Sequence, residues 1–260
     1  MAAPVPRGLP TFWPGNSMLL KMKLFLLSSL LLLAEWASAS VIIDGTRVVY
    51  PQKAREVTVQ LHNTGDSPSL VQSWVDEGDK DATPDTTSAP FIITPPISRV
   101  EAGSGQALRL TFTGRDLPSD RESLFWLNVL EVPPAPESAE DKNLMQLAFR
   151  SRLKIFYRPD GLSGRANLSS HSLECEFESE QRVMRCSNPT PYHISVVKLE
   201  LAHESGEKNQ VEKGMMFSPF SSHNFEIGFK NDVKEGTKAV FTSINDFGGA
   251  VEASIDISRQ

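Results

Sequence analysis

The amino-acid sequence predicts an all-β protein of two sandwich domains, and three observations carry this prediction. Short segments that alternate apolar and polar residues recur along the chain, and turns containing Pro and Gly separate them. No long window has the period of an amphipathic helix. Each half of the chain beyond residue 39 is long enough for one immunoglobulin-sized sandwich of about 100 residues.

Composition and charge exclude several classes of protein. The 260 residues carry a formal net charge of -6 and are 40% hydrophobic, which is typical of a globular chain. The acidic balance argues against nucleic-acid binding, which needs a basic surface. The sequence contains no zinc-protease, nucleophile-elbow or phosphate-binding glycine motif, and its 5 His and 2 Cys form no metal-binding pattern. We therefore expect no enzyme, no metal and no cofactor.

The first 39 residues have the pattern of an export signal. A basic start, an apolar run and an A-x-A end follow one another at Lys21 and Lys23, residues 24–34 and residues 37–39. A membrane span needs about 20 apolar residues, and Glu35 ends this run too early. We expect cleavage after Ala39 and a mature chain that is not embedded in a membrane. Met18 precedes the basic start and is an alternative to Met1 as the first residue.

Seven segments are predicted to be strands, in addition to the long strand described in the next paragraph. They either alternate apolar and polar residues or are apolar on both faces. These segments are residues 45–50, 56–63, 70–75, 107–113, 124–130, 194–201 and 239–244.

A single long strand is predicted at residues 144–157. Its odd positions are apolar apart from Ser151, and its even positions are largely basic. A Pro-Asp-Gly turn signal at residues 159–161 ends it. We therefore place the domain boundary here, which gives an N-terminal domain of residues 40–160 and a C-terminal domain of residues 161–260.

The two cysteines, Cys175 and Cys186, flank a polar segment at residues 178–181 that reads as a hairpin tip. An exported chain meets an oxidising compartment, so we predict a disulfide across the two arms. Two free buried thiols are the alternative.

The composition of the long strand allows two interpretations. Its odd side can face the core of its own domain while the basic even side is solvated. Alternatively, it is an edge strand that offers apolar side chains to a partner, because residues 144–149 carry no charge and natural edges are usually blunted by charge or Pro. Such edges bind partners by strand addition. Burial of Met145, Leu147 and Phe149 would contribute roughly 5–9 kcal/mol, at ~1.5–3 kcal/mol each.

Arg47 and Lys154 are the second candidate site. Each alone is typical of a solvated surface charge. If folding brings both into one cleft, they would bind a carboxylate by charge-assisted hydrogen bonds.

Six stretches of the chain, in this order, carry a resemblance to the periplasmic pilus-assembly chaperones of Gram-negative bacteria. They are GTRVVY at residues 45–50, TPP at 94–96, DRESLFWLN at 120–128, RLKIFYRP at 152–159, NPTPY at 188–192 and INDFGG at 244–249. The short connection over residues 132–143 is similar to the subclass that serves rod-like pili.

The resemblance implies two immunoglobulin-like domains in a boomerang arrangement and a function in donor-strand complementation. The implied partners are fimbrial (pilin) subunits and an outer-membrane usher, and the free edge also permits a self-capping dimer. The residues implied are Met145, Leu147 and Phe149 as donor side chains, Arg47 and Lys154 as the anchor of the subunit's C-terminal carboxylate, and Glu122, Arg158 and Asp246 as an interdomain ionic cluster.

One feature of the long strand conflicts with a simple version of this interpretation. Lys154 is even-numbered and the donor residues are odd-numbered, so a regular strand points them to opposite faces. Either a bulge intervenes or the anchor works from the other face. The competing functions are a secreted two-domain adhesin or pilus structural component, and a secreted hydrolase.

Overall fold

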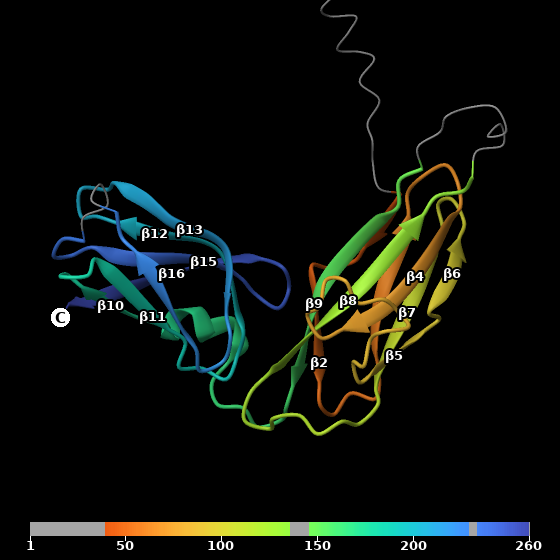
Figure 1. Ribbon diagram of the computed structural model, residues 1–260, viewed down its shortest axis with the longest axis horizontal. Coiled ribbons are helices and arrows are strands. Elements are labelled where there is room, and N and C mark those ends of the chain that lie inside the picture. Colours follow the sequence, from red (N-terminus) through yellow and green to blue (C-terminus); the bar gives the residue numbers. More distant parts are fainter. Residues whose placement is uncertain (1–39, 136–145, 229–232, 260) are drawn as a thin grey trace, which may run out of the picture. The chain divides into compact units, whose positions relative to one another are not determined.

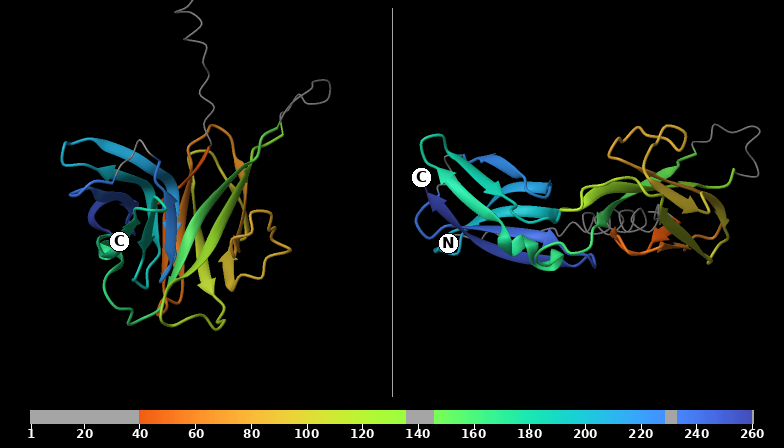
Figure 2. Two further views of the ribbon diagram at one scale, coloured as in Figure 1. Left: turned by 60° about the vertical axis from the view of Figure 1, so that its left-hand side comes forward. Right: turned by 90° about the horizontal axis from the view of Figure 1, so that it is seen from below.

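The computed structural model describes residues 40–135, 146–228 and 233–259, and this part of the chain consists mainly of β-strands. The strands between residues 41 and 158 gather in one sandwich, and those between residues 174 and 259 gather in another (Figures 1 and 2). The predicted all-β class with two sandwich domains is confirmed.

Two sheets form the N-terminal domain. The first has the order β1 (Val41–Ile43), β3 (Val57–Asn63), β7 (Gly105–Phe112), β5 (Phe91–Thr94). The second has the order β2 (Arg47–Pro51), β9 (Phe149–Arg158), β8 (Ser123–Val132), β4 (Ser69–Asp76), β6 (Ile97–Val100). Alternate side chains of each strand point inwards, and together they form an apolar core that includes Leu61, Leu108, Leu127 and Ile155.

The first two strands belong to different sheets. Only the second of them pairs with β9, and it is too short to pair with the whole of β9. β1 pairs with β3, whereas β2 pairs in parallel with β9 from Arg47↔Lys154 to Pro51↔Arg158. Gly45 lies where the chain crosses between the sheets and has a φ of 95°, a conformation that side-chain-bearing residues rarely adopt. Because β2 begins only at Arg47, it pairs with the second half of β9 and not with the first.

Seven strands of the described chain form the C-terminal sandwich. Their order is β13 (Lys208–Phe217), β12 (Ile194–Ala202), β15 (Lys238–Ile244), β16 (Ala250–Arg259), β10 (Glu174–Glu178), β11 (Val183–Ser187), β14 (Ser222–Glu226). β16 changes partner along its length, pairing with β15 up to Asp256 and with β10 from Ile257. This change divides the strands into two layers around a core that includes Met184, Leu199 and Phe241.

Strand β9 is shorter than predicted. It begins at Phe149, and residues 146–148 have no regular secondary structure, so the prediction of one strand over 144–157 is wrong for those three residues. Residues 144 and 145 lie outside the described part. The β8–β9 ladder ends at Glu131↔Phe149, and Pro133 and Pro134 then follow β8 without the N–H groups that would continue it. The other predicted segments are confirmed as β2, β3, β4, β7, β8, β12 and β15, with small shifts at their ends.

The predicted disulfide is confirmed. Cys175 and Cys186 face each other in register on β10 and β11 and are bonded. The alternative of two free thiols is therefore wrong. A short 3-10 helix, η2 (Ala166–Ser172), precedes this hairpin. The proposed domain boundary at residue 160 stays a prediction.

Candidate functional site

The first half of β9 has an open edge. Residues 149–153 bond to β8 on one side. On the other side, no strand within the described ranges pairs with them, because β2 begins opposite Lys154. The N–H and C=O groups of an open edge can bond to a strand from another chain.

The odd-numbered side chains change from exposed to buried along this region. Leu147 and Phe149 are 57% and 47% exposed, whereas Leu153 is 7% exposed and Ile155 is fully buried. Leu147 and Phe149 therefore do not fill the core of their own domain. Met145, the third predicted donor residue, lies outside the described residues.

Arg47 and Lys154 lie next to each other where the open edge ends. They are register partners on the parallel strands β2 and β9. Nη1 of Arg47 donates to the carbonyl oxygen of Ile244 at 2.8 Å, and Nζ of Lys154 donates to the hydroxyl of Ser195 at 3.2 Å. Nε of Arg47 is buried and has no hydrogen-bond partner.

The two cations lack a direct acidic partner. Among the residues that the structure describes, no carboxylate lies within ion-pair distance of Arg47 or Lys154, in contrast to Arg152 and Arg158. Two adjacent positive charges with a spare N–H donor suit a carboxylate ligand.

Electrostatics support the same conclusion. Burial lowers the pKa of Lys154, and the positive charge of Arg47 lowers it further. Burial also lowers the pKa of Arg47, although the negative charges of Asp246 and Glu122 partly oppose this shift. The environment thus disfavours both charged forms, and a bound anion would reverse the effect because an opposite charge favours them.

Aromatic rings flank the cation pair. The guanidinium carbon of Arg47 lies 5.8 Å from the ring centroid of Phe156, and Nζ of Lys154 lies 5.7 Å from that of Trp126. Such positions over a ring are favourable for a cation. Sequence reasoning missed Trp126 and Ser195 as neighbours of Lys154. The register Trp126↔Lys154 follows from strand pairing, which the sequence does not state.

The structure brings Glu122, Arg158 and Asp246 together. Nε of Arg158 donates to Glu122 at 2.7 Å, and its Nη1 and Nη2 donate to the two carboxylate oxygens of Asp246 at 2.8 and 3.0 Å. The second oxygen of Glu122 accepts from the backbone N–H of His193 at 2.8 Å. Burial lowers the pKa of Arg158, but the hydrogen bonds and charges of Asp246 and Glu122 outweigh it, and the net shift is upwards.

The face on which Lys154 lies is also clear. The register between β8 and β9 is unbroken from Ser123↔Tyr157 to Glu131↔Phe149, so no bulge separates Lys154 from Phe149. Of the two options left by the sequence, the bulge is therefore wrong, and an anchor that works from the other face stays a prediction. Lys154 and the exposed Phe149 lie on opposite faces of β9, and the open edge lies between the faces.

Neither a metal site nor a membrane-spanning helix is found in the described residues. They contain no group of three or more His, Cys, Asp or Glu that could hold a metal ion. In the same residues, no helix is long and apolar enough to cross a membrane.

Comparison with known families gives two matches that together span most of the chain. Residues 40–163 match the family model described as "Pili and flagellar-assembly chaperone, PapD N-terminal domain". Residues 169–255 match "Pili assembly chaperone PapD, C-terminal domain".

Individual relatives and solved structures agree with these matches. The "Probable fimbrial chaperone YadV" of Escherichia coli K12 is 42% identical over 221 residues, which are 83% of this chain and 89% of the relative. The "Chaperone protein MrkB" of Klebsiella pneumoniae is 42% identical, over 84% of this chain and 91% of the relative.

The crystal structure of the YadV chaperone superposes with a TM-score of 0.70 at 41% identity, over 83% of this chain and 98% of that one. A chain from the complex of the Salmonella enterica SafA pilin with the SafB chaperone gives a TM-score of 0.69 at 27% identity, over 85% and 97%. With two family models and relatives of this identity and coverage, the chain belongs to the family of pili assembly chaperones, whose members are chaperones and not enzymes.

Proposed function

We propose that this chain is a periplasmic chaperone that binds fimbrial (pilin) subunits by donor-strand complementation. The single observation that carries the proposal is the open edge of β9 at residues 149–153, which has exposed Leu147 and Phe149 at one end and the cations Arg47 and Lys154 at the other. The subunit is a sandwich that lacks a strand, and the chaperone supplies β9 to the vacant groove. Membership of the chaperone family supports this function.

The position of β2 gives the direction of the bound subunit strand. A strand added along residues 149–153 would lie in line with β2 and would end against Arg47. If its C-terminus points toward Arg47, it runs parallel to β9, and its terminal carboxylate reaches Arg47 and Lys154. The pair would then anchor the C-terminus of the subunit by charge-assisted hydrogen bonds.

The apolar side chains would supply further affinity. Burial of Leu147 and Phe149 in the subunit groove would contribute roughly 3–6 kcal/mol, at ~1.5–3 kcal/mol per side chain, before ordering costs are subtracted. Met145 would add a third such side chain.

Four finer parts belong to the same proposal. The compartment is the periplasm, reached through a signal peptide that is cleaved after Ala39. The chaperone delivers the bound subunit to an outer-membrane usher. Without a subunit, the open edge can pair with a second copy in a self-capping dimer. The ionic cluster of Glu122, Arg158 and Asp246 ties the N-terminal domain (40–160) to the C-terminal domain (161–260).

Co-expression tests the proposal. The tagged chain is produced in the periplasm with candidate fimbrial subunits from the same genome, and the subunits that co-purify are identified. We expect a stable one-to-one complex for the unsubstituted chain. We expect no complex for Arg47→Ala or Lys154→Ala, with melting temperatures close to that of the parent. Lys53→Ala is the matched control, because Lys53 is an exposed cation of the same domain.

A second measurement isolates the anchor. A subunit whose C-terminal carboxylate is converted to an amide should bind the parent chain much more weakly, because the amide lacks the negative charge. The same amide should make little difference to a chain that already lacks Lys154. Equal binding of acid and amide by the parent would contradict the anchor, and failure of every subunit to bind would contradict the chaperone function.

The alternative of a secreted adhesin or pilus structural component is not favoured. The matched family models describe assembly chaperones over both domains.

A further inference from the structure

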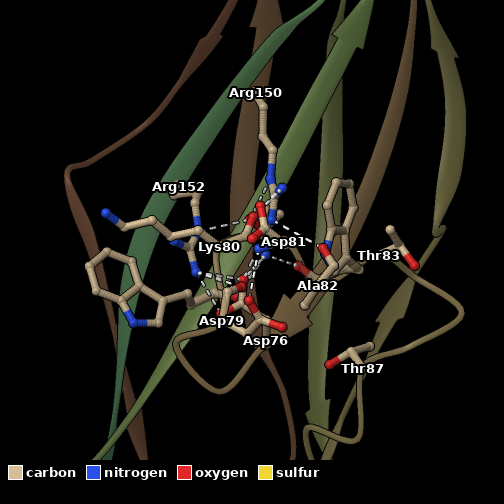
Figure 3. A network of polar contacts seen from close by, with 12 residues as sticks. Asp76, Asp79, Lys80, Asp81, Ala82, Thr83, Thr87, Arg150 and Arg152 are labelled. Atoms are coloured by element: carbon tan, nitrogen blue, oxygen red, sulfur yellow. Dashed lines mark hydrogen bonds and ion pairs between the residues drawn. The ribbon is translucent and has the colours of Figure 1, made fainter.

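A buried polar network lies beside the open half of β9, on the outer face of the same sheet. Asp76 ends β4 and Asn128 lies within β8, and the two residues are 1% and 0% exposed. Arg150 and Arg152 reach them from β9 (Figure 3). None of these four residues belongs to the proposed anchor or to the proposed donor side chains.

The four side chains form one connected set of contacts. Nη2 of Arg152 lies 2.6 and 2.7 Å from the two carboxylate oxygens of Asp76. Nε of Arg152 and Nε of Arg150 both donate to Oδ1 of Asn128, at 3.1 and 3.0 Å. Nδ2 of Asn128 donates to Asp76 at 2.7 Å, which completes the set. Burial strengthens these bonds and makes any unpaired member costly.

The loop after β4 closes over the network. Arg150 donates from Nη1 to the carbonyl oxygen of Lys80 at 2.8 Å and from Nη2 to that of Ala82 at 3.2 Å. The Ala82 oxygen also accepts from Nε1 of Trp74 at 3.1 Å, and Arg150 lies 4.7 Å from the centroid of that ring. Figure 3 shows both arginine side chains directed toward this loop and Asp76. The side chains of β9 are thus fastened to two strands and one loop.

The network also reaches the cation pair. Arg152 lies 4.9 Å from the ring centroid of Trp126, and Lys154 lies 5.7 Å from the same centroid. The side chains of Arg150, Arg152 and Lys154 all lie on the even-numbered face of β9. On the even-numbered face, the side chains from Arg150 to Lys154 are therefore held in place, while the edge and the odd-numbered residues Phe149 and Ser151 remain exposed.

We propose that Asp76, Asn128, Arg150 and Arg152 are positioning residues that keep the open edge of β9 extended before a subunit arrives. An edge strand with one neighbour opens more easily than a strand with two. The contacts of Arg150 and Arg152 lie on the even-numbered face of β9. They can oppose this opening while the edge and the exposed odd-numbered side chains remain available to a subunit. A strand that is already ordered loses less conformational entropy on binding, so the subunit is captured faster and more tightly. The inference rests on the proposed function, because it concerns how β9 is offered to the subunit.

Hydrogen–deuterium exchange of the free full-length mature chain tests the positioning role without any subunit. We compare the parent with Arg150→Gln/Arg152→Gln and with Asp76→Asn. The amides of residues 149–153 that bond to β8 should exchange at least about tenfold faster in the variants. The amides of residues 155–157, which lie between β2 and β8, should keep their rates. Glu77→Gln is the control, since Glu77 lies in the same loop and its ion pair with Arg115 is exposed.

The outcomes of this experiment are distinct. Faster exchange confined to residues 149–153 supports the positioning role. Unchanged rates would overturn it, and so would an equal increase in both halves of β9, since that would indicate only a less stable domain. If Asp76→Asn does not fold, Arg150→Gln alone provides the test, because its side chain lies nearer the surface.

Subunit capture provides the second readout. The fimbrial subunit that co-purifies with the parent is mixed, during refolding, with each variant. Glu77→Gln should capture it at the parent's rate, and Arg150→Gln/Arg152→Gln about tenfold more slowly. Arg150→Lys/Arg152→Lys should restore part of the rate, because the charges remain although several of the guanidinium hydrogen bonds are lost. If the parent itself captures no subunit, the proposed function fails, whereas a normal rate in the double Gln variant would overturn only the positioning role.

Discussion

The two halves of β9 share one alternating sequence pattern but have different surroundings. In the second half, residues 154–157 lie between β2 and β8, and Ile155 is fully buried in the core. In the first half, residues 149–153 have β8 alone, and Phe149 is 47% exposed. The difference arises outside β9, because β2 begins only at Arg47.

One half of a strand can thus contribute to the stability of its domain while the other half remains available for the proposed binding. The covered half holds the sandwich together, and the open half presents the backbone groups and apolar side chains that would contact a subunit strand in the proposed function. Substitutions in the two halves should therefore separate the two properties.

The largest effect is expected from Ile155→Ala in the covered half. Removing these core atoms should lower the free energy of unfolding by about 4 kcal/mol, since a large-to-small change leaves a cavity. Urea denaturation followed by tryptophan fluorescence measures this. Leu147→Ala is the matched control, and an equal loss in both variants would contradict the difference between the halves.

A smaller effect is expected from Glu122→Gln, at the covered end of β9. The change removes the buried charge that pairs with Arg158, and Asp246 remains as the only carboxylate of the cluster. We expect a loss of about 2–3 kcal/mol, below the range for fully buried pairs because Arg158 and Asp246 are each about one-fifth exposed. Thermal melts of Glu122→Gln and of Arg121→Gln, which breaks an exposed pair nearby, would reveal the difference. An unchanged melting temperature for Glu122→Gln would argue against the cluster as a stabilising contact.

The sequence predicted the fold well because the fold depends on local patterns. Alternation, turn signals and the export-signal pattern need no knowledge of which strands pair. They identified the disulfide and about half of the described strands, and they missed β1, β5, β6, β13, β14 and β16. Resemblance to a chaperone family then supplied the proposed roles of Arg47 and Lys154. Their adjacency, however, depends on the parallel pairing of β2 with β9. The two residues are 107 positions apart, and no local sequence pattern indicates that these strands pair.

The polar network was the main feature that sequence reasoning missed. The sequence places Arg150 and Arg152 on a basic even-numbered face, for which solvation is the simplest interpretation. Their partners, Asp76 and Asn128, are on two other strands and are brought together only by the register of the sheet. A signal did exist, since Asn128 is a polar residue within a segment that is otherwise apolar on both faces.

A third substitution tests whether loss of stability alone reduces binding. Cys175→Ser/Cys186→Ser opens a disulfide in the C-terminal sandwich, away from β9. Loss of this cross-link, which closes only a short loop of the unfolded chain, should lower the free energy of unfolding by about 2 kcal/mol. Denaturant midpoints with and without reductant measure the loss, and subunit co-purification measures binding. Retained binding would show that a lesion of this size outside β9 leaves the open edge functional, whereas lost binding would make stability the common cause.

The smallest effect on stability is expected from Leu147→Asp in the open half. Leu147 is 57% exposed and precedes β9, so a charge there should change the free energy of unfolding by no more than about 0.5 kcal/mol. The same charge would have to enter an apolar groove of the subunit, at a cost of several kcal/mol, so subunit co-purification should be lost. Leu168→Asp is the control, because Leu168 is 54% exposed but belongs to η2 in the other domain. A stable chain that no longer binds subunits would assign binding to the open half of β9. Normal binding by Leu147→Asp would instead mean that the exposed apolar side chain is not offered to the partner, and the distinction between the two halves would then concern pairing alone.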